Sequence, residues 1–570
     1  MMSQTCSIGW RYKWLVGPPL LVEGYADPHV LTSLWLHRIP INCHISLFQP
    51  SSPQSVHRGR TKTMRFLLIF ILAFTSWAQE ETVSVSSPNW EIVGKRIQFQ
   101  DHKIDQFKGI PYAEPPVGNL RFKKPLPLKE FPKKLEAINR APGCLQVPLQ
   151  IDRKYNMSSL FDPSTKTEDC LYLNIWSPAD KTDSSKGKAV MIWVYGGAFL
   201  LGSIELMFYN GLALAALGDV VVVTVNYRVG SFGLLTAGTA DEPGNLALYD
   251  QQLAFTWVKD NIHHFGGDPS RITIFGESAG GISISAHVTS PKCKGLFQRA
   301  IIQSGTTLTS DLIFSKDSML KKSDEIAKNS GCLENGVSLR SHPDQVLNCL
   351  RSKDPEVLLE AEYEFMDNLE EYDQLGIIYN EEFLDYKSLF PFQPSTVNEV
   401  QLMIGVTKDE TVALLPFFFV DMIAPDFVLT KEKAYQIPKR LMKDISNRQA
   451  IDEIENFYLK EVDESNTTAL DIAMNKLITD LMFICPSIYY VNNELFRERD
   501  IHFYYYTHPN TQSNPLRKEN WPGAFHFDEV PYVFGIPLMI PSLPYNDLEK
   551  SFSMDLLDLW SSFAKSGYWI

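Results

Sequence analysis

The hydrophobic positions change their pattern along the chain, and from Leu171 onward they predict strands that alternate with helices. Residues 189–195 and 219–226 are nearly unbroken apolar runs, which are typical of strands covered on both faces. Residues 212–217 predict a short helix, and residues 246–262 predict a longer one because apolar residues recur there near helical spacing. This alternation predicts a mostly parallel α/β sheet.

The segments on either side of this core have different patterns. Residues 84–125 alternate strand-like pieces with turns, and they predict an antiparallel opening to the sheet. Residues 310–400 are mainly helical in pattern and charged, and we expect them to form an insertion over the carboxyl edge of the sheet, where ligands bind in such folds. Residues 400–405 and 501–506 predict the last two strands, and residues 553–564 predict a closing helix.

The apolar run at 272–275 ends in Gly276-Glu277-Ser278-Ala279-Gly280, and a helix-compatible stretch follows at 282–288. Strand, sharp turn and helix are the context of a G-x-S-x-G nucleophile elbow. The turn forces the serine into a strained conformation, and a side chain at either glycine would collide with the neighbouring strand and helix. The N–H of Ala279 begins a helix and is able to donate to an oxyanion. The motif therefore predicts a catalytic nucleophile at Ser278.

A second glycine-rich turn, Gly196-Gly197-Ala198, directly follows the apolar run at 189–195. Small residues at such a turn let two backbone N–H groups point into one space, as a tetrahedral oxyanion requires. With the elbow downstream, this turn predicts an oxyanion hole.

A serine hydroxyl attacks at neutral pH only with a base, and the imidazole that serves as base needs a carboxylate to fix its tautomer. In this fold the three groups follow in the order serine, acid, histidine. The loop after a later strand offers Asp409 and Glu410, and the pattern does not choose between them. Of the histidines beyond that loop, His502 falls within a predicted strand, whereas His508 and His526 both fall in loops.

Charge and motif content exclude several other classes of function. The 570 residues carry 53 Lys and Arg against 67 Asp and Glu, a net charge of −14, without a long basic cluster. This balance argues against nucleic acid and against anionic membrane surfaces as partners. His263 and His264 are adjacent rather than four apart, no cysteine pair has zinc spacing, and no glycine motif for a dinucleotide or phosphate occurs. We therefore expect no cofactor and no metal.

The first 78 residues do not have the pattern of a fold. Residues 1–63 are proline-rich and aperiodic, and we interpret them as a non-structural upstream extension. Residues 64–78 combine a basic start, an apolar run too short to span a bilayer and a small-x-small cleavage site, which predicts a signal peptide. Because a signal peptide stands first, we expect Met64 to be the initiator and the secreted chain to be 79–570. A signal anchor with a short cytosolic tail is the alternative.

Cysteines and sequons agree with export. Beyond the signal peptide the cysteines are Cys144, Cys170, Cys293, Cys332, Cys349 and Cys485. Pairing the first two, and pairing Cys332 with Cys349, would close two local loops, each worth about 3–4 kcal/mol. Asn156 and Asn466 lie in Asn-x-Ser/Thr sequons and are candidate glycosylation sites.

From about Trp90 to its end, the chain resembles the type-B carboxylesterase/cholinesterase family of α/β hydrolases. Besides the elbow, the matching stretches are residues 107–122, 168–175, 226–230, 244–251, 265–269 and 303–305. The resemblance implies an α/β-hydrolase fold with a central, mostly parallel sheet flanked by helices. It also implies a secreted serine esterase that acts on small-molecule esters without a cofactor or a stable membrane anchor.

The resemblance assigns roles to individual residues. The family's nucleophile falls on Ser278, its acid on Glu410 and its histidine on His526, which decides between the alternatives above. The implied oxyanion donors are Gly197, Ala198 and Ala279. The family's two internal disulfides fall on Cys144–Cys170 and Cys332–Cys349. Glu277 is expected to shape the field beside the serine without belonging to the triad.

The chain departs from the family at the positions that hold choline. The family's tryptophan in the first cysteine loop falls on Phe161, and its aromatic pair after the acid falls near Ala413 and Leu414. Without these rings, cation–π attraction for a quaternary ammonium is lost, so we favour a general carboxylesterase. The alternatives are a cholinesterase and a non-catalytic adhesion protein of the neuroligin kind. The chain ends early beside the family, and Cys485 lacks an obvious partner in the sequence.

Overall fold

A computed structural model describes residues 81–148, 163, 165–180, 187–309, 312–334, 336–367, 374–379, 382–384, 397–412, 414, 428–441, 448–493, 496, 499–509 and 523–568. The expected upstream extension and signal peptide lie outside these described residues, as do Asn156, Phe161 and Ala413.

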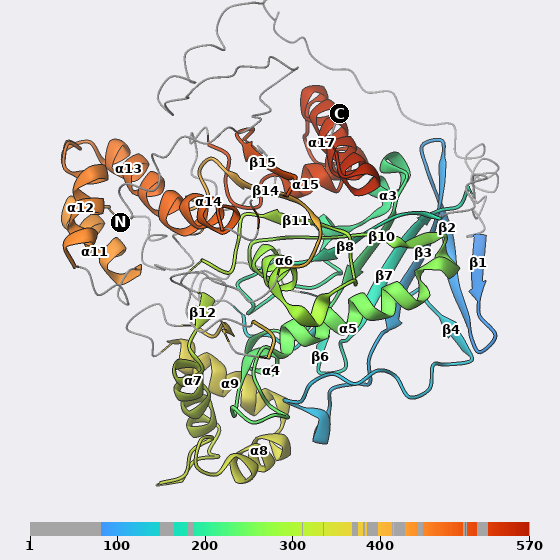
Figure 1. Cartoon of the computed structure of the whole chain (residues 1–570), viewed down its shortest axis with the longest axis horizontal. Coiled ribbons are helices and arrows are strands. Elements are labelled where there is room, and N and C mark those ends of the chain that lie inside the picture. The colour runs from blue at the N-terminus through green and yellow to red at the C-terminus, as the bar shows by residue number, and fades with distance from the viewer. Residues whose placement is uncertain are drawn as a thin grey trace, which may run out of the picture.

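An 11-stranded sheet forms the centre of the fold, with the order β1-β2-β3-β7-β9-β8-β10-β11-β14-β15 and with β4 paired to β2 (Figure 1). Its strands are β1 (Glu81–Ser86), β2 (Glu91–Phe99), β3 (His102–Pro111), β4 (Lys134–Glu136), β7 (Tyr172–Pro178), β8 (Lys188–Val194), β9 (Val221–Val225), β10 (Gly267–Glu277), β11 (Arg299–Gln303), β14 (Gln401–Thr407) and β15 (Ile501–Tyr506). Pairing is antiparallel from β1 to β9 and parallel from β9 to β15. The predicted α/β fold with an antiparallel opening is therefore confirmed.

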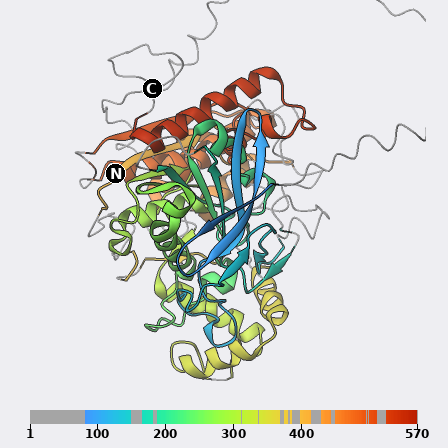
Figure 2. The same ribbon diagram turned by 90° about the vertical axis from the view of Figure 1, so that its right-hand side faces the viewer.

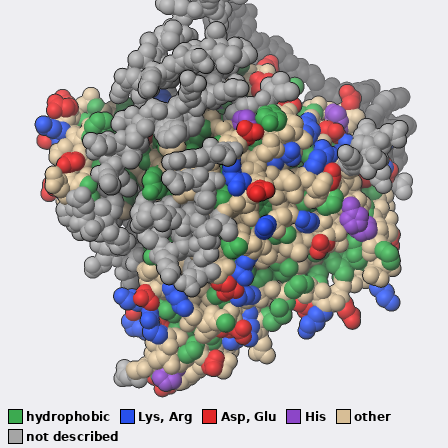
Figure 3. All heavy atoms as spheres, in the orientation of Figure 1, with side chains coloured by type: hydrophobic (Ala, Val, Ile, Leu, Met, Phe, Trp, Pro, Cys, Tyr) green, Lys and Arg blue, Asp and Glu red, His purple; other side chains and the backbone are tan. Residues whose placement is uncertain are grey.

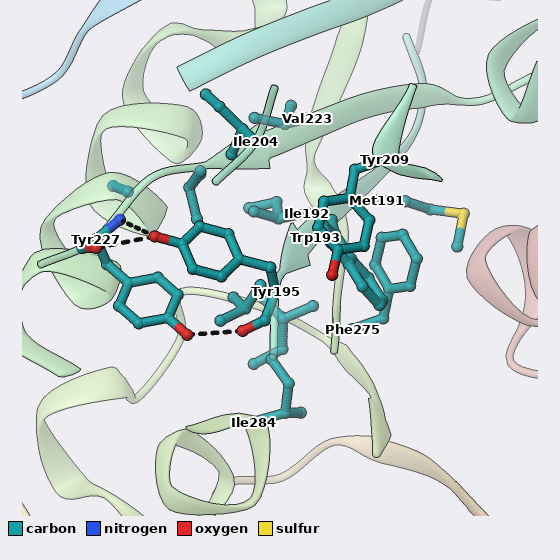
Figure 4. Close-up of a cluster of buried hydrophobic side chains, with 14 of the residues drawn as sticks. Met191, Ile192, Trp193, Tyr195, Ile204, Tyr209, Val223, Tyr227, Phe275 and Ile284 are labelled. Carbon is teal, nitrogen blue, oxygen red and sulfur yellow. Dashed lines mark hydrogen bonds between the residues drawn. The ribbon is translucent and has the colours of Figure 1, made fainter. Parts of the chain in front are cut away.

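The apolar runs became the inner strands because both of their faces are covered. Every residue of β9 is buried, and in β8 all but the first residue are buried. Around β8 the ring of Trp193 packs at a tilt against those of Tyr209 and Phe275, with ring centroids 4.9 Å apart for Trp193 and Phe275 (Figure 4). Two short sheets lie outside the main one, formed by β5 (Gly143–Cys144) with β6 (Lys166–Thr167) and by β12 (Ile313–Phe314) with β13 (Ile377–Ile378).

Helices cover the sheet on two sides. In Figure 1, α3 (Leu212–Gly218) and α17 (Asp547–Ser566) lie above the sheet, and α5 (Leu246–Asn261) and α6 (Ala279–Thr289) lie below it. Figure 2 shows α17 running across the top, with the antiparallel strands toward the viewer. The closing helix begins earlier than the predicted residue 553 because Asn546 and Glu549 form a reciprocal capping box. The short helices are α4 (Gly230–Leu234), α15 (Val530–Val533) and α16 (Ile536–Met539).

The predicted insertion is helical and consists of α7 (Lys316–Asn329), α8 (Pro343–Ser352) and α9 (Pro355–Asp367), at the bottom of Figure 1. Its buried Leu347 and Leu350 belong to a separate small core. Glu362 of α9 accepts hydrogen bonds from the backbone N–H and the hydroxyl of Ser231, 2.9 and 2.7 Å away. Because Ser231 follows β9 by a few residues, the insertion contacts the segment beyond the carboxyl end of that strand.

A second helical group was not predicted. It consists of α11 (Lys431–Leu441), α12 (Arg448–Leu459), α13 (Thr467–Thr479), the π-helix η7 (Asp480–Ile484) and α14 (Cys485–Val491), at the left of Figure 1. The helices α11, α12 and α13 and the π-helix η7 share a third cluster of buried side chains that includes Leu470, Met474 and Phe483, whereas Tyr490 of α14 packs in the main core.

Both expected disulfides are present, Cys144–Cys170 and Cys332–Cys349. Cys293 is buried, and Cys485 belongs to neither bridge. Across the described parts of the chain, no helix combines the length and the apolar character that crossing a bilayer requires. On the face shown in Figure 3, basic and acidic side chains are interspersed.

Candidate active site

Ser278 lies in the sharp turn between β10 and α6, with a strained backbone conformation of φ 59° and ψ −125°. The surrounding structure holds the turn from both sides. Its N–H donates to the carbonyl of Gln303, 2.9 Å away, and its own carbonyl accepts from the N–H of Ile282 at 2.8 Å. The side chain of Ser278 is half-buried, so its hydroxyl stands at the tip of the turn, as the elbow motif predicts.

The two glycines of the elbow allow β8 to pass directly against it. A Cβ atom added at Gly280 would lie 2.1 Å from the carbonyl oxygen of Val194, and one added at Gly276 would lie 2.6 Å from the same oxygen. Both contacts are with backbone, which has little freedom to move because β8 and β10 pair in parallel through Val194 and Gly276. The expected collision at these positions is thus present.

The turn Gly196-Gly197-Ala198 lies against the elbow. A Cβ atom added at Gly196 would be 2.9 Å from Cβ of Ser278. Gly197 has φ 109° and Ala198 has φ 57°, so both adopt backbone conformations that favour glycine. The carbonyl of Gly197 accepts from the N–H of Leu200 at 2.9 Å. Because a trans peptide directs its N–H opposite to its carbonyl, the N–H of Ala198 points away from that bond.

His526 and Glu410 form a buried pair. Nδ1 of His526 lies 2.6 Å from Oε2 of Glu410, and the other carboxylate oxygen accepts from the N–H of Thr407 at 2.7 Å. Glu410 is fully buried. The other candidate acid, Asp409, bonds a different residue: its Oδ1 accepts a hydrogen bond from the side-chain amide of Asn475 at 2.9 Å.

The other two candidate histidines lie among aromatic rings. His508 packs on Phe552, with centroids 4.4 Å apart, and its pKa is lowered by burial. His502 is in β15, as the strand prediction requires, and it contacts Phe563 and Tyr568. Only His526 of the three lies beside Glu410.

Nε2 of His526 faces Glu277, the residue before the serine. Its distance to Oε1 of Glu277 is 3.0 Å, although the two groups lack the alignment of a good hydrogen bond. Among the hydrogen bonds of the described residues, none joins the hydroxyl of Ser278 to His526. Burial lowers the pKa of His526, but the carboxylates of Glu277 and Glu410 outweigh it and raise the pKa well above its usual value. The imidazole is therefore held next to the elbow in a field that favours its protonated form.

Three further side chains support this arrangement and were not singled out from the sequence. Gln303 donates from Nε2 to Glu529 at 3.0 Å, while its own carbonyl holds the N–H of Ser278. Burial and the neighbouring Glu277 raise the pKa of Glu529 to about 8. The ring of Phe483, presented by the π-helix, lies 5.0 Å from the imidazole of His526. Gln303 stands within a matched family stretch and Glu529 three residues after His526, but no local signal marks Phe483.

Aromatic side chains pack next to the histidine. Phe527, next to the histidine, packs edge to face on Phe208, with centroids 5.5 Å apart, and also contacts Tyr209. Leu414, the described member of the expected choline positions, packs on the cluster that includes Phe483. No group of metal-ligating side chains occurs within the described residues.

A strained serine between a parallel strand and a helix, beside a glycine-rich turn and a buried histidine–carboxylate pair, defines the class of α/β hydrolases. The sequence matches the model of the Carboxylesterase family over residues 80–568, and the chain belongs to that family. It is a carboxylic ester hydrolase.

Several relatives are similar over most of their length. The chain is 35% identical over 474 residues to Acetylcholinesterase-1 of Trittame loki, which covers 81% of this chain and 82% of that protein. It is 33% identical to Cholinesterase of Mus musculus, over 90% of this chain and 84% of the other. It is also 33% identical to Acetylcholinesterase 4 of Caenorhabditis briggsae, over 88% of this chain and 84% of the other.

The close approach at the elbow predicts the effect of Gly280→Ala. Because the added methyl overlaps the carbonyl of Val194, we expect the free energy of unfolding to fall by about 3 kcal/mol or more. The control is Gly336→Ala, where φ is 80° but an added Cβ meets nothing within 4 Å. Strain alone costs about 1–2 kcal/mol there. Denaturant unfolding measures both, and equal losses would contradict the collision.

The contact between His526 and Glu277 predicts the effect of Glu277→Gln. Removing this carboxylate should lower the pKa of His526, because an opposite charge within a few ångströms favours the charged imidazole. The pH titration of the downfield Nδ1–H resonance measures the change. Asp409→Asn is the control, since that side chain bonds Asn475 instead of the imidazole. An unchanged pKa in Glu277→Gln would be inconsistent with the contact.

Proposed function

We propose that the chain is a secreted serine esterase that hydrolyses neutral carboxylic esters through an acyl-enzyme. The observation that carries the proposal is the buried pair of His526 and Glu410, 2.6 Å apart, next to the strained elbow of Ser278. Because Glu410 accepts the proton on Nδ1, it fixes the tautomer that leaves Nε2 free to take a proton. Membership in the Carboxylesterase family supports these roles.

The reaction begins when Nε2 of His526 turns from Glu277 to the hydroxyl of Ser278, the next residue along the chain. Oγ then attacks the ester carbonyl while Nε2 takes its proton. The N–H groups of Gly197, Ala198 and Ala279 stabilise the oxyanion, and such a donor is typically worth about 3 kcal/mol of the barrier. The imidazolium returns its proton to the leaving alcohol, and water repeats the sequence to release the acid.

The carboxylates near His526 act on this proton transfer in two opposing ways. Glu277 and Glu410 raise the pKa of His526, so they stabilise the imidazolium that each attack step creates. The same shift means that His526 serves as a base only after it has lost its proton. The value of kcat/KM should therefore rise as the pH rises through the pKa of His526 in the free enzyme.

The side chain at one of the expected choline positions, Leu414, supports a neutral substrate. Leu414 is aliphatic, and an aliphatic side chain offers no π-face to a quaternary ammonium. A cholinesterase is the second candidate, since three relatives carry names of that kind. A non-catalytic adhesion protein is disfavoured because serine, histidine and glutamate of the family pattern all occur in the sequence.

Secretion is supported by features along the chain. Residues 64–78 have the pattern of a signal peptide, and the two disulfides are typical of an oxidising compartment. Asn466, one of the two sequon asparagines, is exposed at the start of α13, where its side chain accepts from the N–H of Ala469. We propose that it is glycosylated, together with Asn156.

A fluorophosphonate probe should label the full-length protein at Ser278, because the activated hydroxyl attacks phosphorus as it attacks an ester. Ser278→Ala should abolish labelling and lower kcat by about 10⁶-fold. Ser562→Ala, at a partly buried position of α17 outside the site, is the control and should label normally. Folded wild-type protein that remains unlabelled would disprove a catalytic serine.

Charge selectivity separates the two candidate substrates. Acetylthiocholine and its neutral analogue, the 3,3-dimethylbutyl thioester of acetic acid, differ only in carbon for nitrogen. If no aromatic cage is present, the cation–π attraction, which is worth about 1–2 kcal/mol, is missing for the choline ester. The kcat/KM values of the two substrates should then agree within about tenfold. A preference for the cation of more than about 100-fold would favour the cholinesterase instead.

A further inference from the structure

Tyr195 and Tyr227 form a stacked, reciprocally bonded pair in the buried cluster around β8 (Figure 4). Their ring centroids lie 4.3 Å apart, the planes differ by 18°, and both side chains are fully buried. The hydroxyl of Tyr195 donates to the carbonyl of Tyr227 at 2.9 Å. The hydroxyl of Tyr227 donates in return to the carbonyl of Tyr195 at 2.7 Å.

The carbonyl of Tyr195 occupies a special place in the fold. Tyr195 is the first residue after β8 and directly precedes the turn Gly196-Gly197-Ala198. Its carbonyl also touches the elbow, because a Cβ atom added at Gly280 would lie 2.9 Å from the oxygen. The Tyr227 hydroxyl thus holds the one peptide group that both contacts the elbow and begins the oxyanion turn.

A turn that contains two consecutive glycines needs an interaction from outside the turn to fix its backbone. Gly196 and Gly197 have no side chains to restrict their backbone, and glycine loses more conformational freedom on folding than any other residue. The carbonyl of Tyr195 and the N–H of Gly196 share one planar unit, so fixing the carbonyl fixes the entry direction of the turn. The next two peptide units then carry the N–H groups of Gly197 and Ala198.

We propose that Tyr227 is a positioning residue for ester hydrolysis: by holding the Tyr195 carbonyl, its hydroxyl sets the direction of the Gly197 and Ala198 N–H groups. This inference rests on the proposed function, since only oxyanion chemistry makes that direction matter to the rate. Burial raises the pKa of Tyr227 well above its usual value, so the phenol keeps its proton and donates at every working pH.

Tyr227→Phe, compared with Tyr112→Phe in the full-length protein, tests the proposal. Tyr112 is equally buried, and its hydroxyl donates to the main-chain carbonyl of Asn226, also at 2.7 Å. Each variant therefore loses one buried bond of the same type and length, at a cost of about 1 kcal/mol of stability. Only Tyr227→Phe releases the carbonyl at the oxyanion turn.

We expect Tyr227→Phe to lower kcat about 10-fold or more, with KM within about twofold, because part of the oxyanion stabilisation is lost. Affinity for an aryl trifluoromethyl ketone, which forms a tetrahedral adduct with the serine, should fall in parallel. Tyr112→Phe should keep both values near those of the wild type. Titration with the fluorophosphonate probe counts active sites, so kcat is expressed per folded site.

The remaining outcomes overturn the inference. In the first, the wild type hydrolyses esters but both variants lose kcat equally. In the second, the kcat of Tyr227→Phe returns to the wild-type value once it is divided by the number of labelled sites. In either case Tyr227 has only a structural role, and the proposed function stands. A Tyr227→Phe protein that does not fold leads to the same conclusion. Wild-type protein that neither labels nor hydrolyses overturns the inference together with the proposed function.

Discussion

The close contact between the end of β8 and the elbow is the constraint on which the rest of the site depends. The carbonyl of Val194 lies where any side chain at Gly276 or Gly280 would have to go. This contact sets the serine turn directly against the turn that follows β8, so Ser278 and the backbone amides of that turn share one small space. The strained conformation of Ser278 persists because the sheet, the N-terminus of α6 and the carbonyl of Gln303 together over-determine it.

A second constraint is electrostatic. Two buried carboxyl groups, those of Glu277 and Glu410, contact the imidazole of His526, and a third, that of Glu529, is buried within the field of these two. Burying an unpaired charge costs free energy, so a buried carboxyl group either binds a proton or pairs with an opposite charge. The pKa of Glu529 rises to about 8, so this group is mostly protonated at neutral pH, while Glu410 bonds the ring directly. The carboxylates of Glu277 and Glu410 therefore supply a counter-charge for protonated His526, as the proposed acyl transfer would require.

Local pattern was sufficient for the sheet and for the elbow, because both depend on neighbours in the sequence. The apolar runs at 189–195 and 219–226 became β8 and β9, and the glycines around Ser278 marked the turn. The residues alone did not decide between Asp409 and Glu410 as the acid, or between His508 and His526 as the base. These choices depend on a contact between residues more than 100 positions apart in the sequence. The helices α11–α14 and the placement of Phe483 depend on tertiary packing in the same way.

The strands that hold the serine turn and the side chains that pack near the histidine come from different parts of the chain. Backbone contacts among β8, β10 and β11 hold the serine turn, whereas Phe483 and Leu414 belong to the cluster of α11, α12, α13 and the π-helix η7. A change in size at Phe483 would therefore alter the space beside His526 while the backbone contacts that hold the serine turn remain, so the fit around the histidine and the strain at the serine depend on separate parts of the fold.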